Sequence, residues 1–350
     1  MAMIESITAQ DLVVAWQGAK THEGLNDQSI FWSRSADAGA TWSDVQVLVS
    51  GGQYAPWGPV FHWDGNALWL FYAQSGAFDQ DAKEPGRSSV GGDICTITSH
   101  DHGVTWSAPR VILPFASKDG KTPKVTANKL VVGANGRWIL PIWQTPNGVN
   151  STGAQAAGVL LSDDAGATWR ANMIWNASTK LIENSIGIAA KNGTLVMLFR
   201  TGEGVLYRSY GSPDGETWSP PAPSEVPNPN SKAFVFTDHD GRLVLACNPV
   251  KKRPRNPLVL EISTDGGATF AEYVNLDPGE RTLDLEYPTA VEIDVAEEEE
   301  EEGSATSRFA RRRRRKKTTK RAILTVFSAD HYTGIKLSRT AAYEAVNYDS

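Results

Sequence analysis

The sequence has little of what marks disulfide-stabilised, metal-binding or membrane-spanning proteins. Only two of its 350 residues are cysteines, Cys95 and Cys247, which excludes a disulfide framework, and no CxxC pair indicates zinc. The six histidines show no metal-ligand spacing such as HExxH, so we expect neither a metal nor a cofactor. The longest apolar runs, such as Leu195–Phe199, are too short to span a bilayer.

The chain also has only a small excess of negative charge and no visible targeting signal. The formal net charge is -6 and charged residues make up 21% of the chain, so nothing attracts the whole protein to nucleic acid or anionic membranes. Residues 1–10 lack a basic stretch followed by an apolar one, and without a visible secretory signal we expect a cytoplasmic protein by default. The hydrophobic content of 41% is enough for a large core.

What the sequence does contain is a repeated turn motif, Ser-x-Asp-x-Gly-x-Thr-Trp, in a chain with 12 Trp and 31 Gly. Its copies are Ser35–Trp42, Ser99–Trp106, Ser162–Trp169, a shortened Ser212–Trp218, and Ser263–Phe270. The steps from serine to serine are 64, 63, 50 and 51 residues. A period of this length is typical of four-stranded β-propeller blades.

The chemistry of this motif, the Asp box, explains why it recurs. Asp and Ser side chains form hydrogen bonds within their own turn, and Gly supplies a positive φ. The aromatic residue then buries its ring while the turn stays in contact with water. We therefore expect each Asp box to lie in an outer hairpin and to have a structural rather than a catalytic role.

Apolar runs between the boxes predict the strands. Four of them follow a Gly-containing turn and suit inner strands buried on both faces: Ala67–Tyr72, Trp138–Ile142, Leu195–Phe199 and Leu243–Ala246. Two more follow the last box, Ala322–Phe327 and Gly334–Leu337, and no long amphipathic helix is evident. The sequence predicts one all-β domain over residues 1–350, a six-bladed β-propeller whose ring closes by pairing strands from the two chain ends.

One charged stretch fits no blade. Six glutamates, Glu297 to Glu302, precede the basic run Arg311 to Lys317. Like charges repel each other and stay solvated, so residues 296–321 are predicted to be an exposed loop with little regular structure, inserted in the last blade. A nuclear-localisation or anion-binding role of the basic run is the alternative.

The boxes and the residues described next resemble the sialidase superfamily, in particular bacterial-type sialidase-like proteins with BNR (Asp-box) repeats, over nearly the whole chain. The resemblance implies a retaining exo-glycosidase that acts on a terminal anionic sugar of a glycan, such as sialic acid. Family arginines bind the sugar carboxylate, and their positions match Arg200, at the end of a strand, and Arg255, with Arg253 as the rival. Arginine suits this task because its fork matches a carboxylate.

The same resemblance supplies the catalytic groups. Tyr287 falls at the family nucleophile, although Pro288 replaces the usual serine, and Glu183 falls at the glutamate that takes the phenol proton. A tyrosine avoids the repulsion that a carboxylate nucleophile would meet from an acidic sugar. The acid/base position falls on Glu23, with Asp27 close by as the alternative. If this holds, the Tyr287 hydroxyl should lie about 2.6–3.2 Å from a Glu183 oxygen.

Several points stay open at this level. The family's first-strand arginine would fall at or before Met1, and no arginine precedes Arg34. Either the true N-terminus is missing or sialic acid is not bound in the usual way. Structural roles remain possible for each site residue, and three tryptophans fit either sugar stacking or core packing: Trp57, Trp63 and Trp143. A non-catalytic carbohydrate-binding or scaffold propeller is the second hypothesis, because the fold hosts both.

Overall fold

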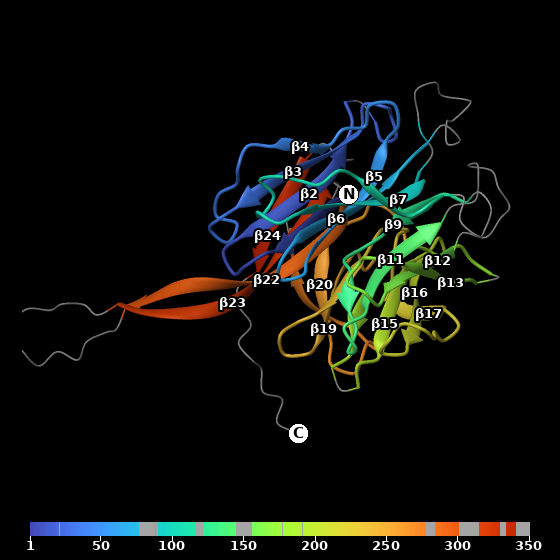
Figure 1. The fold of residues 1–350 in the computed structure, drawn as a ribbon. Helices are drawn as coiled ribbons and strands as arrows, with labels where there is room; N and C mark the ends of the chain where they lie inside the picture. Colours follow the sequence, from blue (N-terminus) through green and yellow to red (C-terminus); the bar gives the residue numbers. More distant parts are fainter. Residues whose placement is uncertain are drawn as a thin grey trace, which may run out of the picture.

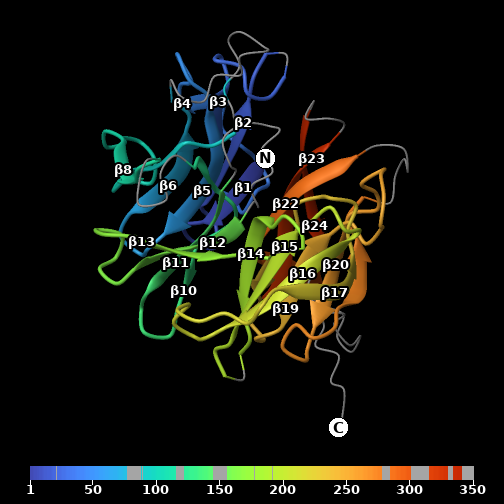
Figure 2. The ribbon, with the colours of Figure 1, turned by 90° about the vertical axis from the view of Figure 1, so that its right-hand side faces the viewer.

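The computed structural model describes residues 1–20, 22–76, 88, 90–115, 122–144, 156–176, 178–190, 192–277, 284–300, 315–329 and 334–340. These residues form 24 strands in six antiparallel sheets arranged around a central axis (Figure 1, Figure 2). The prediction of an all-β, six-bladed propeller is therefore confirmed. The described ranges contain no helix that could cross a membrane.

Each sheet is one blade, and in every sheet but the third the strands pair in the order of the sequence. Blade one comprises β1 (Ala2–Ser6), β2 (Leu12–Gly18), β3 (Ser29–Ser35) and β4 (Gln46–Val49). Blade two comprises β5 (Pro56–Trp63), β6 (Leu68–Gln74), β7 (Asp93–Ser99) and β8 (Arg110–Leu113). Blade three comprises β9 (Lys124–Thr126), β10 (Val131–Val132), β11 (Trp138–Gln144), β12 (Ala156–Ser162) and β13 (Arg170–Ile174).

Blades four to six continue the pattern around the axis. Blade four comprises β14 (Ile182–Ile188), β15 (Leu195–Arg200), β16 (Val205–Gly211) and β17 (Ala222–Pro227). Blade five comprises β18 (Phe234–Thr237), β19 (Leu243–Cys247), β20 (Val259–Ser263) and β21 (Ala271–Asn275). Blade six comprises β22 (Leu285–Glu300), β23 (Arg315–Ala329) and β24 (Gly334–Thr340).

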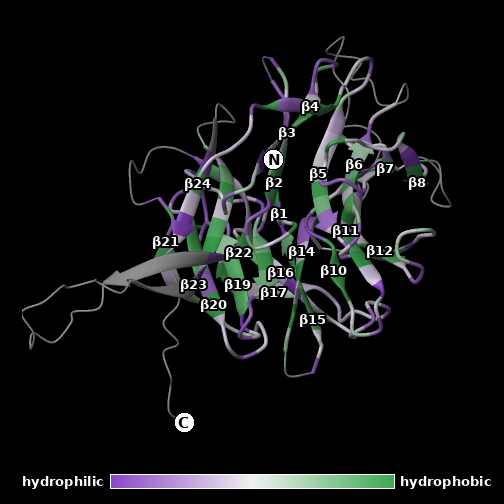
Figure 3. Ribbon diagram, turned by 60° about the vertical axis from the view of Figure 1, so that its left-hand side comes forward, coloured by the Kyte–Doolittle hydropathy of each residue, from purple (hydrophilic) through white to green (hydrophobic). Residues whose placement is uncertain are grey.

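The four apolar runs form β6, β11, β15 and β19, which take the second position from the axis in their blades. In blade three, β9 and β10 both pair with β11 and share the innermost position. The four runs are buried on both faces, as β11 and β19 are along their whole length. Hydrophobic residues follow the strands, whereas polar residues gather in turns and on outer strands (Figure 3). The core therefore lies between neighbouring blades, as in the cluster that joins blades two, three and four.

The ring closes differently from the expectation. Within the described residues, β1 pairs with β2 of its own blade, and β24 pairs with β23. Blades one and six instead pack face to face through apolar side chains such as Ile4 and Leu324. The Ile4 amide also donates to the Thr289 hydroxyl, at 3.2 Å. The interface between the first and last blades is therefore a packed one, like the others.

All five Asp boxes connect the third strand of a blade to its outermost strand, as predicted. In the third copy, the Ser162 and Thr168 hydroxyls donate to Asp164 at 2.8 and 2.6 Å. In the second copy, Gly103 has φ +92 and a Cβ there would lie 2.5 Å from the ring of Trp32. The boxes therefore lock outer hairpins and pack against the preceding blade.

The prediction of a loop over residues 296–321 is wrong at both its ends. Strand β22 continues to Glu300 and β23 begins at Arg315, and these two residues are partners in an antiparallel ladder. The hairpin extends as an arm away from the propeller (Figure 1). Glutamates of one strand fall opposite basic residues of the other, and opposite charges at paired positions favour a ladder. Residues 301–314 lie outside the described residues.

Candidate active site

One end of the propeller carries all the candidate residues, although the Asp27 side chain is exposed there. Glu183 and Tyr287 lie near the start of the innermost strands β14 and β22, and Arg200 ends β15. Glu23 and Arg255 lie in loops between second and third strands. In antiparallel blades these positions share one end, opposite the Asp boxes, which we call the site end.

Glu183 and Tyr287 occupy equivalent, strained backbone positions. Both have left-handed backbone angles, φ 44 and φ 56, and both lie where the register shifts by one residue against the second strand. Gly58 has φ 60 in the same irregularity of β5. A left-handed non-glycine residue costs about 1–3 kcal/mol and is concentrated at functional sites. Pro288 follows naturally, because a bulge tolerates a residue without an N–H donor.

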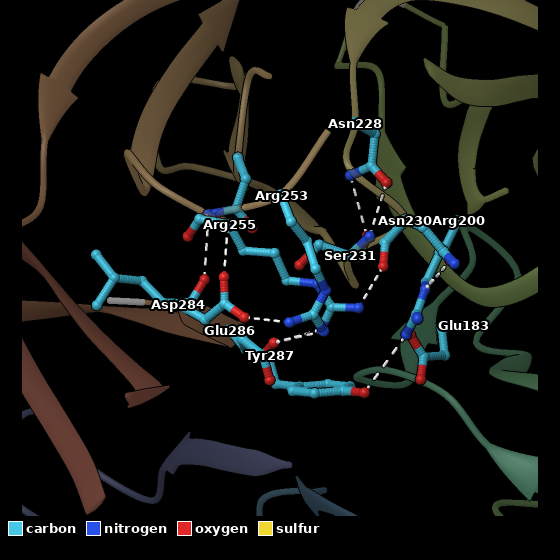
Figure 4. Close-up of polar contacts among 12 residues, drawn as sticks. Glu183, Arg200, Asn228, Asn230, Ser231, Arg253, Arg255, Asp284, Glu286 and Tyr287 are labelled. Atoms are coloured by element: carbon cyan, nitrogen blue, oxygen red, sulfur yellow. Dashed lines mark hydrogen bonds and ion pairs between the residues drawn. The ribbon is translucent and has the colours of Figure 1, made fainter. Parts of the chain in front are cut away.

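Arg200 joins these two residues (Figure 4). Its Nη1 donates to Glu183 Oε2 at 2.6 Å and to the Tyr287 hydroxyl at 3.4 Å, and its Nε donates to Asn230 Oδ1 at 2.7 Å. Burial opposes its charge, but the Glu183 carboxylate and Tyr287 raise the pKa of Arg200 above its usual value. Glu203, three residues after Arg200, accepts a hydrogen bond from the Thr179 hydroxyl at 2.9 Å.

Arg255 lies deeper than Arg200. Only 5% of its side chain is exposed, and it donates to Glu286 Oε1 at 2.6 Å and to the Asn230 carbonyl at 2.5 Å. Arg253 is 53% exposed and contacts Asp284 and Glu286. Arg255 thus points inward onto a buried glutamate, and Arg253 lies on the rim. Asn230 accepts hydrogen bonds from both Arg200 and Arg255.

The structure separates the two acid/base candidates. Glu23 accepts a short hydrogen bond from Gln17, whose Oε1 accepts from the Gly58 amide at 2.7 Å. Burial raises the pKa of Glu23, and Glu183 and Arg200 act on it electrostatically. Asp27 is exposed and accepts only a long hydrogen bond from the Lys20 amide among the contacts seen. Glu23 therefore faces the site and Asp27 faces solvent.

Blade one contributes no arginine to this end among the described residues. Arg34 lies on β3 and forms two hydrogen bonds with Asp11, at 2.8 and 2.6 Å, near the box end. The tryptophans offer little stacking surface: Trp57 and Trp143 are buried, and Trp63 packs edge-on against His102. Core packing accounts for these residues.

Sequence reasoning missed three further residues here: Glu286, Asn230 and Lys232. Lys232 is completely buried, and its Nζ has no hydrogen-bond partner among the described residues. Burial lowers the pKa of Lys232 to about 7, and nearby Glu183 acts in the opposite direction. The only signals were a glutamate next to Tyr287 and an Asn-Pro-Asn turn before a strand.

Two other features were considered as sites. Within the described ranges no three His, Cys, Asp or Glu side chains gather in the way a metal site requires. A cavity of about 660 Å³ lies at the box end, lined by residues such as Tyr210, Asp240 and Asp265. Asp265 is engaged by its own box and Asp240 by Arg242, so this cavity offers no free acid or base.

The amino-acid sequence matches a known family over most of its length. Residues 10–296 match the model of the BNR repeat-like domain. A curated relative, a sialidase from Micromonospora viridifaciens, is 25% identical over 297 residues, which cover 77% of this chain and 44% of the relative. The chain thus spans less than half the length of that relative.

Solved structures agree on the fold. A Hadza microbial sialidase superposes with a TM-score of 0.71 at 17% identity, covering 97% of this chain and 65% of the other. A Dyadobacter fermentans protein described as of unknown function gives 0.72 at 16% identity, covering 98% and 94%. An intramolecular trans-sialidase from Ruminococcus gnavus gives 0.67 at 14%, covering 97% and 93%.

Proposed function

The chain belongs to the BNR repeat-like domain family, and we propose that it is a retaining exo-glycosidase of the sialidase type that releases a terminal anionic sugar, sialic acid or a related acid. One observation carries the proposal. Arg200 lies between Glu183 and the Tyr287 hydroxyl, so a cation, a carboxylate and a phenol from two blades meet at the axis. An ordinary strand-end ion pair would not require two strained residues to meet there.

Arg200 would bind the sugar carboxylate. Its Nη2 has no hydrogen-bond partner among the described residues, while Nε and Nη1 are anchored by Asn230 and Glu183. An arginine held on one side presents the other side of its fork without losing side-chain freedom on binding. Arg255 adds a second positive charge near this position. Each of its two terminal nitrogens, Nη1 and Nη2, makes one hydrogen bond and keeps a second hydrogen to donate.

Tyr287 would be the nucleophile. Its oxygen attacks the anomeric carbon while its proton passes to the Glu183 carboxylate, which is ion-paired with Arg200 at 2.6 Å. The bond from the anomeric carbon to the departing oxygen breaks through an oxocarbenium-like transition state. The Arg200 guanidinium, 3.4 Å from the phenol oxygen, stabilises the charge that develops there.

Glu23 would supply and recover the other proton. Burial raises the pKa of this carboxyl group, which favours the protonated form that a general acid needs. In the first step Glu23 gives its proton to the leaving oxygen. In the second step it takes a proton from water, the water oxygen attacks the anomeric carbon, the bond from that carbon to the Tyr287 oxygen breaks, and the phenol regains its proton from Glu183. Two inversions give net retention.

The second candidate is a carbohydrate-binding propeller without turnover. The position of Arg255 favours it, because a guanidinium that is 5% exposed and held by Glu286 is poorly placed to contact a sugar directly. Both candidates predict binding of an acidic sugar, and they differ only in bond cleavage.

A hydrolysis assay with a panel of fluorogenic α-ketosides of sialic acids, compared with neutral glycosides, tests the proposal. The variants are Tyr287→Phe and Glu183→Gln, with Tyr273→Phe on the outer strand β21 as the matched control. We expect hydrolysis of acidic glycosides that falls at least about a thousandfold in Tyr287→Phe and is unchanged in the control. Binding of the sugar without hydrolysis by the unmodified protein would support the second candidate.

A further inference from the structure

The turn that joins blade four to blade five is closed by its own side chains. The Asn228 side chain accepts from the Ser231 amide at 2.9 Å and donates to the Ser231 carbonyl at 3.0 Å. Its own amide donates to the Gly204 carbonyl at 2.9 Å, and the side chain is completely buried. Between these two residues Asn230 has φ 56, a left-handed angle that asparagine tolerates better than most residues. The turn therefore holds Asn230 in one conformation.

Asn230 contacts both candidate sugar-binding arginines. Its side-chain oxygen accepts from Arg200 Nε at 2.7 Å, and its carbonyl accepts from Arg255 Nη2 at 2.5 Å. Arg200 belongs to blade four and Arg255 to blade five, so this residue bridges two blades at the rim (Figure 4). Because guanidinium only donates, the amide oxygen must face Arg200, and this fixes the rotamer of Asn230.

We propose that Asn230 is the positioning residue that sets the orientation of the Arg200 guanidinium and its separation from Arg255, and thereby the preference of the site for a carboxylate. The proposal deepens the proposed function and rests on it where it concerns substrate. Without Asn230 Oδ1, Arg200 keeps only its Nη1 contacts and its plane can turn about them. A bidentate match to a carboxylate requires that plane to be fixed.

Three variants separate the side chain of Asn230 from its backbone conformation. Asn230→Gly keeps the carbonyl and allows the left-handed angle but removes the oxygen that accepts from Arg200. Asn230→Ala removes the same oxygen and also strains the turn. Asn230→Asp keeps an acceptor but adds a negative charge where an acidic sugar binds. Asn192→Gly, in an exposed turn at the box end, is the matched control.

The first readout does not depend on activity. In ¹⁵N-resolved NMR spectra, the Arg200 Nε–H proton, assigned from its absence in Arg200→Lys, should exchange slowly in the unmodified protein and in Asn192→Gly. It should exchange at least about tenfold faster in Asn230→Gly, because a hydrogen bond between a charged donor and this oxygen is lost. Unchanged exchange would overturn the positioning role, whether or not the protein is a glycosidase.

The second readout compares a sialic acid glycoside with its carboxyl methyl ester. In Asn230→Gly we expect KM for the acid to rise about tenfold with kcat little changed, while KM for the ester stays constant. Asn230→Asp should lose the acid preference altogether. Equal losses for acid and ester would assign Asn230 a general structural role and overturn its part in specificity. If the unmodified protein neither hydrolyses nor binds either compound, the proposed function fails, the carboxylate preference falls with it, and the exchange measurement alone decides the positioning role.

Discussion

The two ends of this propeller differ in whether their polar side chains are held by local contacts or by contacts between blades. At the box end the same turn recurs five times, and its aspartates are saturated with short local hydrogen bonds. At the site end the neighbours come from different blades, the three left-handed non-glycine residues Glu183, Asn230 and Tyr287 all contact Arg200, and Lys232 is buried without a hydrogen-bond partner among the described residues. Repetition along the chain thus marks what holds the fold, while the site lies where the blades differ.

Arg200 and Arg208 give the sharpest test of this contrast. They lie on neighbouring strands of blade four but serve opposite ends: Arg208 donates to the Gly267 and Ala268 carbonyls of the next box and lies over the Tyr210 ring. We expect Arg200→Ala to lower kcat/KM for an acidic glycoside about a thousandfold or more, because carboxylate binding and support of Tyr287 are lost together.

Arg208→Ala should instead lower the melting temperature and leave kcat/KM within about twofold, since it removes only contacts with the next box and with Tyr210, far from the site. Steady-state kinetics and thermal unfolding of both variants are the measurements. Comparable kinetic losses in the two variants would mean that the ends are not functionally distinct.

Glu23 and Asp27 test the blade-one side of the site. Glu23→Gln should lower kcat/KM about a hundredfold for a sugar with a poor leaving group, and much less for a nitrophenyl glycoside, whose leaving oxygen needs no proton. Because burial raises the pKa of Glu23, its loss should also flatten the decline of activity at high pH.

Asp27→Asn is the matched control, because this side chain is exposed in the same loop. It should retain normal activity and the normal pH profile. If Asp27→Asn carries the defect and Glu23→Gln does not, the assignment of the two carboxyl groups is reversed.

Replacing Lys232 tests whether its buried amine lowers the free energy of unfolding of the protein. Its pKa is about 7 in the folded protein and near 10 when unfolded. Between these values the unfolded chain binds a proton that the folded protein lacks, so stability rises with pH over this window. At and below pH 7, Lys232→Met should therefore be more stable than the unmodified protein, by on the order of 3 kcal/mol.

The gain from Lys232→Met should shrink as the pH rises towards the unfolded pKa of lysine, and only above that pKa is the amine neutral in both states. Urea unfolding at several pH values measures it. Lys129→Met is the control, because Lys129 is ion-paired with Glu5 at 3.0 Å and its loss should not stabilise the protein. A gain that is independent of pH would contradict the electrostatic explanation.

The two ends also differ in how far the sequence could predict them. The box copies predicted blade length and hairpin position, because each box is a local unit of eight residues or fewer, and the strands after the last box supplied the sixth blade. The strand pattern together with the resemblance led to Glu183, Arg200 and Tyr287. The residues that hold them were missed: Asn230 and Glu286 contact their arginines across 25 to 31 positions, and no local pattern announces such contacts.

The charged arm was mispredicted for a related reason. Each block of like charge was judged alone, whereas the ladder brings Glu300 opposite Arg315. The packed closure of the ring likewise depends on which faces meet, such as Ile4 against Leu324, and the sequence of either strand does not specify this. Turns and strands could be predicted from their own residues, whereas the pairing of distant segments could not.

The smallest expected effect belongs to a single Asp box. Asp164 accepts from the Thr168 amide at 2.8 Å and from its hydroxyl at 2.6 Å, and these bonds, the Thr168 hydroxyl first, lower the pKa of Asp164 to about 2. Asp164→Asn keeps one acceptor and loses the charge, so the melting temperature should fall by only about 2–4 °C, with kcat/KM unchanged because the box lies at the far end from the site.

The stabilisation by the carboxylate is complete above the unfolded pKa near 4 and disappears as the pH falls through the folded value near 2. The difference in melting temperature between the two proteins should therefore be constant from pH 7 to 5 and narrow below pH 4. Asp44→Asn, which changes an exposed aspartate just after the first box, is the control variant in the calorimetric scans. A fall in kcat/KM of Asp164→Asn at temperatures where it remains folded would show that the box end reaches the site, and the separation between the two ends would then be abandoned.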